Sequence, residues 1–383
     1  MPTIHPPFAP RGGNTSMHHD PDFPLMFGGS GAWQVYAYHS VLEVLSDYHR
    51  FSNAYMPQGD YYQIGSNLNQ TDPPLHTVLR GVVAAPFKKD TIKQRAPLIR
   101  SLCKRSLESV IAMEKIDFVD DLAYPLSTAV ICDIMGIPGA VHEKVGTWSK
   151  AIVTAGYSEG GIARAQLSQA EMAKLFYGLL AERGAADGQD VLSLLSRASV
   201  NGAPLSIELQ VGTCMTILLA GHETTADFLS NALYLFVQMP GLWEQLQRQP
   251  ALLSGALWEV LRLRPSIVSM YRVALSDTHL EGQLVRKGEI VNAWISTANS
   301  DPEVFEEPET FNPDRSNFAK VLSFGKGVHH CLGDHLAKAV ATLAFELLLS
   351  KVSAVEITST PSPLPSAIVN GFEHFPVSLR AKS

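Results

Sequence analysis

The chain has 383 residues, of which 46% are hydrophobic, so it can bury a large core. Its formal net charge of −7 argues against nucleic acid as the main partner, because phosphate binding requires a basic face. The four cysteines lie far apart and form no CxxC pair, which fits a reduced, cytoplasmic chain without a disulfide framework or a paired-cysteine zinc site.

The N-terminal segment, residues 1–25, is polar and rich in proline, so we expect a flexible arm ahead of a single catalytic domain over residues 26–383. It contains no apolar stretch typical of a signal peptide or an anchor. The most apolar long segment, Val211–Met239, carries GHETTAD at its centre, which a lipid-exposed helix would not. We therefore predict a soluble chain with no membrane span.

The first elements combine a short β-rich start with a long helical part. The sequence AWQVYAY, Ala32–Tyr38, alternates with period two and predicts a strand. After a polar loop at Ser52–Asp72, helical patterns dominate to about residue 265. The clearest helical patterns lie at 120–138, at 160–184 and from Ser206 onward. Ser206 followed by an early glutamate is typical of a helix N-cap.

After Pro265 the pattern changes to short strands and turns. Residues 279–296 alternate apolar side chains and have a glycine near each turn, so they predict hairpins. Residues 300–315, SDPEVFEEPETFNPDR, form an acidic loop too long for a simple connection, so we expect other groups to hold it in place. A last helix is predicted over Leu332–Lys351, before turns and strands. The predicted fold class is mainly α with a minor β part.

The predicted long helix contains AGHETTADF, Ala220–Phe228, which has two interpretations. Glycine weakens a helix by about 1 kcal/mol, and threonine hydroxyls can bond back to the preceding turn, so the segment can be a packed helix kink. Alternatively, Gly221 opens space, and Glu223 and Thr224 present an acid and an alcohol that relay protons to a buried ligand. The segment alone does not separate the two.

A denser pattern, LSFGKGVHHCLGDHLAK, occupies residues 322–338. Cys331 stands near the start of the last helix, where backbone N–H groups favour a thiolate, and the surrounding glycines let the backbone wrap around the sulfur. The nearby histidines suggest zinc, but the adjacent His330 and Cys331 do not converge easily on one ion, and the sequence offers no partner cluster. Zinc is therefore unfavoured, and another metal or a packed junction between a strand and a helix stays open at this point.

FGKGVHHCLG resembles the FGxGxHxCxG signature of the cytochrome P-450 family. The resemblance implies a triangular helical domain with small β-sheets and a long central helix over a haem. It also implies that Cys331 is the axial ligand of the iron of heme b, within a haem-binding turn that includes Phe324, Gly325 and Gly333.

Other segments extend the resemblance over nearly the whole chain. AGHETT is similar to the oxygen-activating segment of the family, which implies catalytic roles for Glu223 and Thr224 and places Ala220 beside the haem. EVLR is similar to ExxR. A Glu–Arg pair three residues apart on a helix is common on surfaces and is weak evidence alone.

The resemblance also assigns two groups of charged side chains. With the arginine of FNPDR, it implies a buried charge cluster behind the haem, formed by Glu259, Arg262 and Arg315. DPPLHTVLR and YRVA are similar to segments of the soluble bacterial members, which implies partners for the haem propionates. These partners would be His76, Arg80, Arg272 and His329.

These resemblances imply a haem-thiolate monooxygenase that hydroxylates or epoxidises an apolar small molecule with O₂. The chain has no GxGxxG within a βαβ unit and no cysteine cluster, so we expect electrons from a separate ferredoxin or flavodoxin with its reductase. The basic run Lys88–Arg105 is either a solvated helix face or the docking surface for such an acidic donor. The alternatives are a peroxide-driven haem enzyme and a non-catalytic haem sensor or ligand carrier.

By the same resemblance, the substrate pocket draws on segments that mix aromatic and aliphatic side chains, so the ligand should be mostly apolar. The segments are Ser52–Asn69, Tyr157–Leu167, Leu219–Ala220 with Thr224, Ile267–Met270 and Asn370–Phe372. Terpenoids, steroids, fatty acyl chains and polyketide-like molecules are all candidates.

Overall fold

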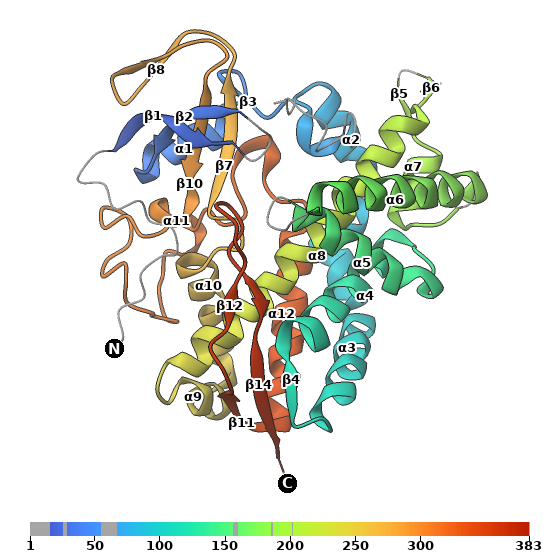
Figure 1. Ribbon diagram of the computed structural model, residues 1–383, viewed down its shortest axis with the longest axis vertical. Coiled ribbons are helices and arrows are strands. Elements are labelled where there is room, and N and C mark those ends of the chain that lie inside the picture. Colours follow the sequence, from blue (N-terminus) through green and yellow to red (C-terminus); the bar gives the residue numbers. More distant parts are fainter. Residues whose placement is uncertain are drawn as a thin grey trace.

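The computed structural model describes residues 16–25, 29–54, 67–155, 160–184, 187–200 and 202–382. Helices dominate, as predicted, and small sheets lie at the edges of the helical part (Figure 1). The α-helices are α1 (Tyr38–Ser46), α2 (Leu75–Val83), α3 (Lys89–Ile111), α4 (Tyr124–Met135), α5 (His142–Val153), α6 (Gly161–Arg183), α7 (Val191–Ser196), α8 (Ile207–Gln238), α9 (Leu242–Arg248), α10 (Leu253–Leu263), α11 (Ile295–Ala298) and α12 (Asp334–Lys351).

The strands form two main sheets and several short pairs. In the first sheet the order is β1-β2-β10-β7-β3, with β10 parallel to β2 and the other neighbours antiparallel. The second sheet has the order β11-β14-β4. The strands are β1 (Met17–Pro24), β2 (Ser30–Val35), β3 (Phe51–Ser52), β4 (Lys115–Asp117), β5 (Ser199–Val200), β6 (Ala203–Pro204), β7 (Ser269–Ala274), β8 (Thr278–Leu280), β9 (Gln283–Val285), β10 (Ile290–Trp294), β11 (Val352–Ile357), β12 (Ser362–Pro363), β13 (Phe372–His374) and β14 (Pro376–Ala381).

The N-terminal segment is more ordered than its composition suggested. Met17–Pro24 form β1 and pair antiparallel with β2, so the expected flexible arm over residues 1–25 is wrong for its second half; residues 1–15 lie outside the described part. Backbone hydrogen bonds to β2 order this polar segment, and aromatic contacts stabilise it further. The rings of His19 and Trp33 lie 5.1 Å apart, and those of Phe23 and Trp294 lie 6.3 Å apart.

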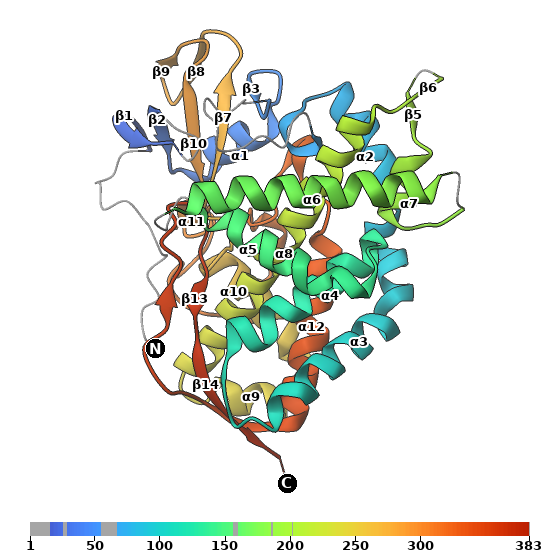
Figure 2. The ribbon, with the colours of Figure 1, turned by 45° about the vertical axis from the view of Figure 1, so that its right-hand side comes forward.

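Helix α8 runs through the middle of the helical part and contacts α4, α5, α10 and α12 (Figures 1 and 2). It starts as predicted, because the Ser206 hydroxyl accepts the Leu209 N–H at 3.3 Å. It continues without interruption through AGHETTADF. A Cβ on Gly221 would lie 2.6 Å from the Ile131 side chain, so glycine here lets α4 pack closely against α8.

The last helix, α12, packs along α3 and begins at Asp334, two residues after the predicted start (Figure 1). Two helix ends follow the sequence signals: α4 stops at Gly136, whose φ is 80°, and α6 stops before Gly184. The predicted hairpin over residues 279–296 contains β8 and β9 and leads into β10. No helix in the described ranges is both long and apolar enough to cross a membrane.

Candidate haem site and its charge cluster

The turn before α12 wraps tightly around Cys331. The Cys331 N–H donates to the Phe324 carbonyl at 2.8 Å, and Gly325 and Gly327 adopt φ values of 66° and 72°, where side chains are strained. A Cβ on Gly327 would also lie 2.9 Å from the Cα atom of Ser46 in α1. Glycine is therefore required at Gly327 both by the turn and by the close approach of α1.

Cys331 differs from the other three cysteines because it is partly exposed, whereas Cys103, Cys132 and Cys214 are buried. Desolvation raises the pKa of the Cys331 thiol to about 11, although a backbone hydrogen bond from Gly333 and the nearby Arg80 lower it. The free thiol would therefore keep its proton at neutral pH. Thiolate formation needs a further positive charge at the sulfur, which a bound metal ion supplies.

Two imidazoles lie together near this turn. The rings of His76 and His329 are 4.2 Å apart, and the Nε2 atom of His329 lies 3.1 Å from a carboxylate oxygen of Asp72. His76 is buried, and its Nδ1 atom has no hydrogen-bond partner. Burial lowers the pKa of both histidines, that of His329 to about 4. The Nδ1 atom of His76 is therefore open to a polar ligand or to a water molecule.

Two guanidinium groups in the same region contact no carboxylate of the residues that the structure describes. The Nη1 atom of Arg272 donates to the Asn53 side-chain oxygen at 2.8 Å and to the Tyr271 carbonyl at 2.7 Å, both uncharged acceptors. Burial lowers the pKa of Arg272 to about 10. Arg80, on α2, forms no hydrogen bond or ion pair with any described residue, although the Cys331 thiol lies within its electrostatic reach. Such desolvated cations favour an anionic ligand.

On α8, a short stretch of an otherwise buried helix has accessible side chains. Ala220 is exposed and Thr224 is partly exposed, although the flanking turns of the helix are buried. The Thr224 hydroxyl donates to the Ala220 carbonyl at 2.6 Å. Glu223, by contrast, is buried, and burial raises its pKa to about 8, so it holds a proton at neutral pH.

Comparison with known proteins decides the family. The sequence pattern described as Cytochrome P450 matches residues 164–370. The chain is 32% identical to the putative cytochrome P450 YjiB of Bacillus subtilis, over 94% of this chain and 91% of that protein. The chain belongs to the cytochrome P450 family. It is also 32% identical to the erythromycin C-12 hydroxylase of Saccharopolyspora erythraea, over 91% of this chain and 89% of that protein.

A solved structure gives the same assignment for the fold. The crystal structure of CYP109E1 from Bacillus megaterium, in complex with testosterone, matches with a TM-score of 0.84 and 31% identity, over 91% of this chain and 92% of that chain. The protein therefore has the P450 fold and is a member of a family of haem-thiolate monooxygenases, and its cofactor is a haem.

The residues present fit a haem. Cys331 offers the sulfur that is accessible, and Arg80, Arg272 and the unpartnered His76 offer donors that suit the two carboxylates of the group. The role of each residue toward the haem stays a prediction. Phe324 packs its ring at 6.1 Å from that of Trp258, with the Lys338 ammonium over both rings.

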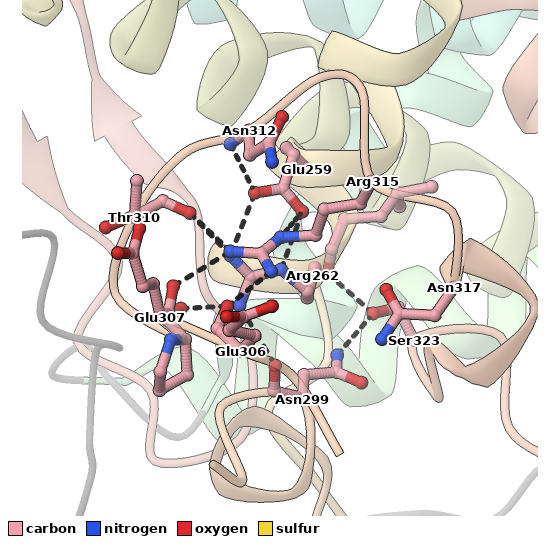
Figure 3. Close-up of polar contacts among 12 residues, drawn as sticks. Glu259, Arg262, Asn299, Glu306, Glu307, Thr310, Asn312, Arg315, Asn317 and Ser323 are labelled. Atoms are coloured by element: carbon pink, nitrogen blue, oxygen red, sulfur yellow. Dashed lines mark hydrogen bonds and ion pairs between the residues drawn. The ribbon is translucent and has the colours of Figure 1, made fainter.

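The P450 chain brings Glu259, Arg262 and Arg315 together in one buried cluster (Figure 3). Arg262 donates to both carboxylate oxygens of Glu259, at 2.6 and 2.8 Å, and the Arg315 Nε atom lies 3.1 Å from the same carboxylate. Their other N–H groups donate to backbone carbonyls of the acidic loop. These carbonyls belong to Glu306, Glu307, Pro308 and Thr310. The cluster therefore holds the acidic loop, residues 300–315, in place, as the sequence predicted.

The expected pocket segments are only partly described. In the segment Ser52–Asn69, residues 55–66 lie outside the described part of the chain. In the segment Tyr157–Leu167, residues 157–159 lie outside it as well. Ile267 and Val369 form a β-bridge, so the segments Ile267–Met270 and Asn370–Phe372 meet. The other histidines of the turn make local contacts: His330 Nδ1 lies 3.1 Å from the Gly325 carbonyl.

Sequence reasoning did not single out two residues of the site. Asp72 contacts His329 and accepts a hydrogen bond from the Ser52 hydroxyl. Burial raises the pKa of Asp72, but these hydrogen bonds outweigh burial and hold the pKa below its usual value. Asn53 accepts from Arg272. Asp72 opens the DPPLH segment, so it was within a recognised motif, whereas nothing around Asn53 in the sequence marks it.

Proposed function

We propose that this P450 is a haem-thiolate monooxygenase that hydroxylates or epoxidises a small apolar molecule with O₂ and with electrons from a separate protein. The observation that supports it most is the group of desolvated cationic and imidazole side chains around an accessible cysteine. Among the described residues, the group contacts one carboxylate, Asp72, and Asp334 lies within electrostatic reach of Arg80. A haem bound there would supply oxygen activation, with Cys331 as its thiolate ligand.

The chain itself would position the ligand and move protons. Arg80, Arg272, His76 and His329 would bind the haem carboxylates, and Ala220 would leave room on α8 above the haem. Glu223, protonated at neutral pH because it is buried, would give up its carboxyl proton, and the Thr224 hydroxyl would pass it to the site. Substitution Thr224→Ala should leave reductant consumption running while product falls and peroxide appears.

A separate electron donor would dock on exposed lysines at the start of α3. Lys88, which precedes the helix, and Lys89 and Lys93 within it are exposed and form no ion pair among the described residues. Helix α3 packs along α12, which begins three residues after Cys331. Arg95 is unsuitable for a docking test, because it forms a 2.8 Å ion pair with Asp133 of α4. Charge reversal at Lys88 and Lys89 should slow reduction by an acidic ferredoxin or flavodoxin and weaken its salt dependence.

The relatives suggest which apolar compounds to test. One relative is an erythromycin hydroxylase, and one structural neighbour was crystallised with testosterone, so the pocket of this chain would take a steroid or a macrolide-sized polyketide. A panel of both classes should be screened for shifts in the spin state of the haem. If only hydrogen peroxide, without reductase, gives product from a bound compound, the peroxide-driven alternative holds instead.

The deciding experiment is the visible spectrum of the reduced protein with carbon monoxide. A strongly red-shifted Soret band requires thiolate ligation, and Cys331→Ser should abolish it. Cys103→Ser is the matched control, since Cys103 is buried between helices and should not affect the band. A normal band in Cys331→Ser would overturn the assignment of the ligand.

A further inference from the structure

Asn53, which no motif assigned, lies beside the buried guanidinium of Arg272. Strand β3 pairs antiparallel with β7, and Ser52 lies opposite Val273 in this pairing. The next position along the same register brings Asn53 to Arg272, and the Asn53 Oδ1 atom accepts a hydrogen bond from the Arg272 Nη1 atom at 2.8 Å. The end of β3 therefore places an uncharged acceptor against a cation that the site offers to the haem.

The contacts of the Asn53 side chain fit only one of its two amide orientations. Its Nδ2 atom donates to the Asn69 backbone carbonyl and, at 3.2 Å, to the Asn69 side-chain oxygen. If the amide were reversed, its N–H groups would face the donors of Arg272 and its oxygen would face the acceptors of Asn69. The contacts at both ends therefore hold the Asn53 oxygen toward Arg272.

The backbone of Asn53 is fixed as well. Its N–H donates to the Asp72 carboxylate at 3.3 Å. The same carboxylate accepts the Ser52 hydroxyl and lies 3.1 Å from the His329 Nε2 atom, so it joins the end of β3 to the cysteine turn. The protein itself thus holds Asn53 at three points, which lowers the cost of ordering its neighbours when a ligand binds.

Asn53 holds the Arg272 guanidinium without neutralising its charge. The two acceptors of Arg272 among the described residues, the Asn53 oxygen and the Tyr271 carbonyl, both bind the Nη1 atom. The Nε and Nη2 groups form no hydrogen bond with the described residues, so they are open to a carboxylate. The nearby Asp72 carboxylate contacts His329 instead. A carboxylate at position 53 would pair with the cation and compete with a ligand for it.

We propose that Asn53 is a positioning residue for the haem: it orients Arg272 toward a haem carboxylate and leaves the charge of the guanidinium for that carboxylate. The inference rests on the proposed function, because it requires that Arg272 binds the haem. It goes beyond that function by making an uncharged side chain at position 53 a condition for tight haem retention.

Haem transfer from the full-length holoprotein to an acceptor protein tests this role without turnover. Asn53→Ala removes the contact with Arg272 and should speed haem loss roughly threefold, because an unheld guanidinium must be ordered when it binds. Asn53→Asp keeps the shape of the side chain but pairs with the guanidinium, so haem loss should be roughly tenfold faster. Both variants should keep the red-shifted band of the reduced carbon monoxide complex, because Cys331 is unchanged.

Gln245→Glu is the matched control for the added charge. Gln245 is exposed on α9, which lies at the other end of the molecule from β3 and β7 (Figures 1 and 2). This variant should lose haem at the wild-type rate. If it loses haem as fast as Asn53→Asp, net charge rather than the contact with Arg272 controls haem retention, and the proposal is overturned.

A double-mutant cycle with Arg272→Met separates this inference from the proposed function. If Asn53 acts through Arg272, neither Asn53 variant should speed haem loss further in the Arg272→Met background. If both variants speed it there as much as in the wild type, or have no effect in the wild type, the inference is wrong and the role of Arg272 stands. If Arg272→Met itself leaves haem loss unchanged, Arg272 does not bind the haem, and the inference fails with that assignment.

Discussion

Substitution Arg262→Met tests how much the buried charge cluster contributes to stability. The Arg262 side chain is fully buried and donates to the Glu259 carboxylate and to three backbone carbonyls, those of Asn299, Pro308 and Thr310. Methionine has a similar apolar stem but no donor. The variant therefore leaves the Asn299 and Pro308 carbonyls unpaired, whereas Thr310 keeps the donor of Arg315. Glu259 keeps Arg315 and the Asn312 N–H as partners.

The expected loss follows from these contacts. Two carbonyls at about 1 kcal/mol each, together with a buried carboxylate that has lost its bidentate partner, give about 3–5 kcal/mol, the range for breaking a buried ion pair. That is a large share of a typical unfolding free energy of about 5–15 kcal/mol. The gain from burying methionine does not offset it, because the carbonyls face the guanidinium rather than an apolar surface.

Urea denaturation followed by fluorescence measures the loss. Arg380→Met is the matched control, because Arg380 forms a 3.2 Å pair with Glu356 at a site where both side chains are largely exposed, and exposed pairs contribute only about 0–1 kcal/mol. If the two variants lose the same free energy of unfolding, the claim that the cluster holds the acidic loop is wrong.

Three further variants test other parts of the structure. Gly327→Ala should cost about 1–3 kcal/mol in thermal denaturation, because its Cβ would collide with α1 at a positive φ, whereas Gly81→Ala, which meets no atom within 4 Å, should be neutral or stabilising. Because the folded-state pKa of Glu223 is raised from 4.5 to about 8, the folded chain holds a proton that the unfolded chain releases, so stability falls as pH rises through this range. Glu223→Gln should reduce this loss of stability with pH, measured by urea denaturation at several pH values. An unchanged pH dependence would assign the loss to Asp227, the other buried acid of α8, whose pKa burial also raises. Arg272→Met should speed haem loss to an acceptor protein roughly tenfold, whereas the exposed Arg286→Met should not.

Local signals in the sequence predicted the features that depend on local structure. The Ser206 cap, the stop of α4 at Gly136 and the glycine turn around Cys331 each need only a few consecutive residues, so the residues themselves were sufficient evidence. Strand β1 was missed because its order comes from pairing with β2 and from rings of distant strands, which its polar composition does not show.

The charge cluster also explains how a remote salt bridge can support the cysteine turn. Arg262 donates to the Asn299 carbonyl, and the side chain of Asn299 accepts the Leu322 N–H and donates to the Ser323 hydroxyl, both at 2.8 Å (Figure 3). Ser323 in turn donates to the Leu261 carbonyl at 2.6 Å, one residue before Arg262. This closed set of hydrogen bonds fixes the backbone just before Phe324, whose carbonyl holds the Cys331 N–H. Loss of Arg262 should therefore loosen the turn as well as the acidic loop, and haem retention in Arg262→Met should fall with its stability.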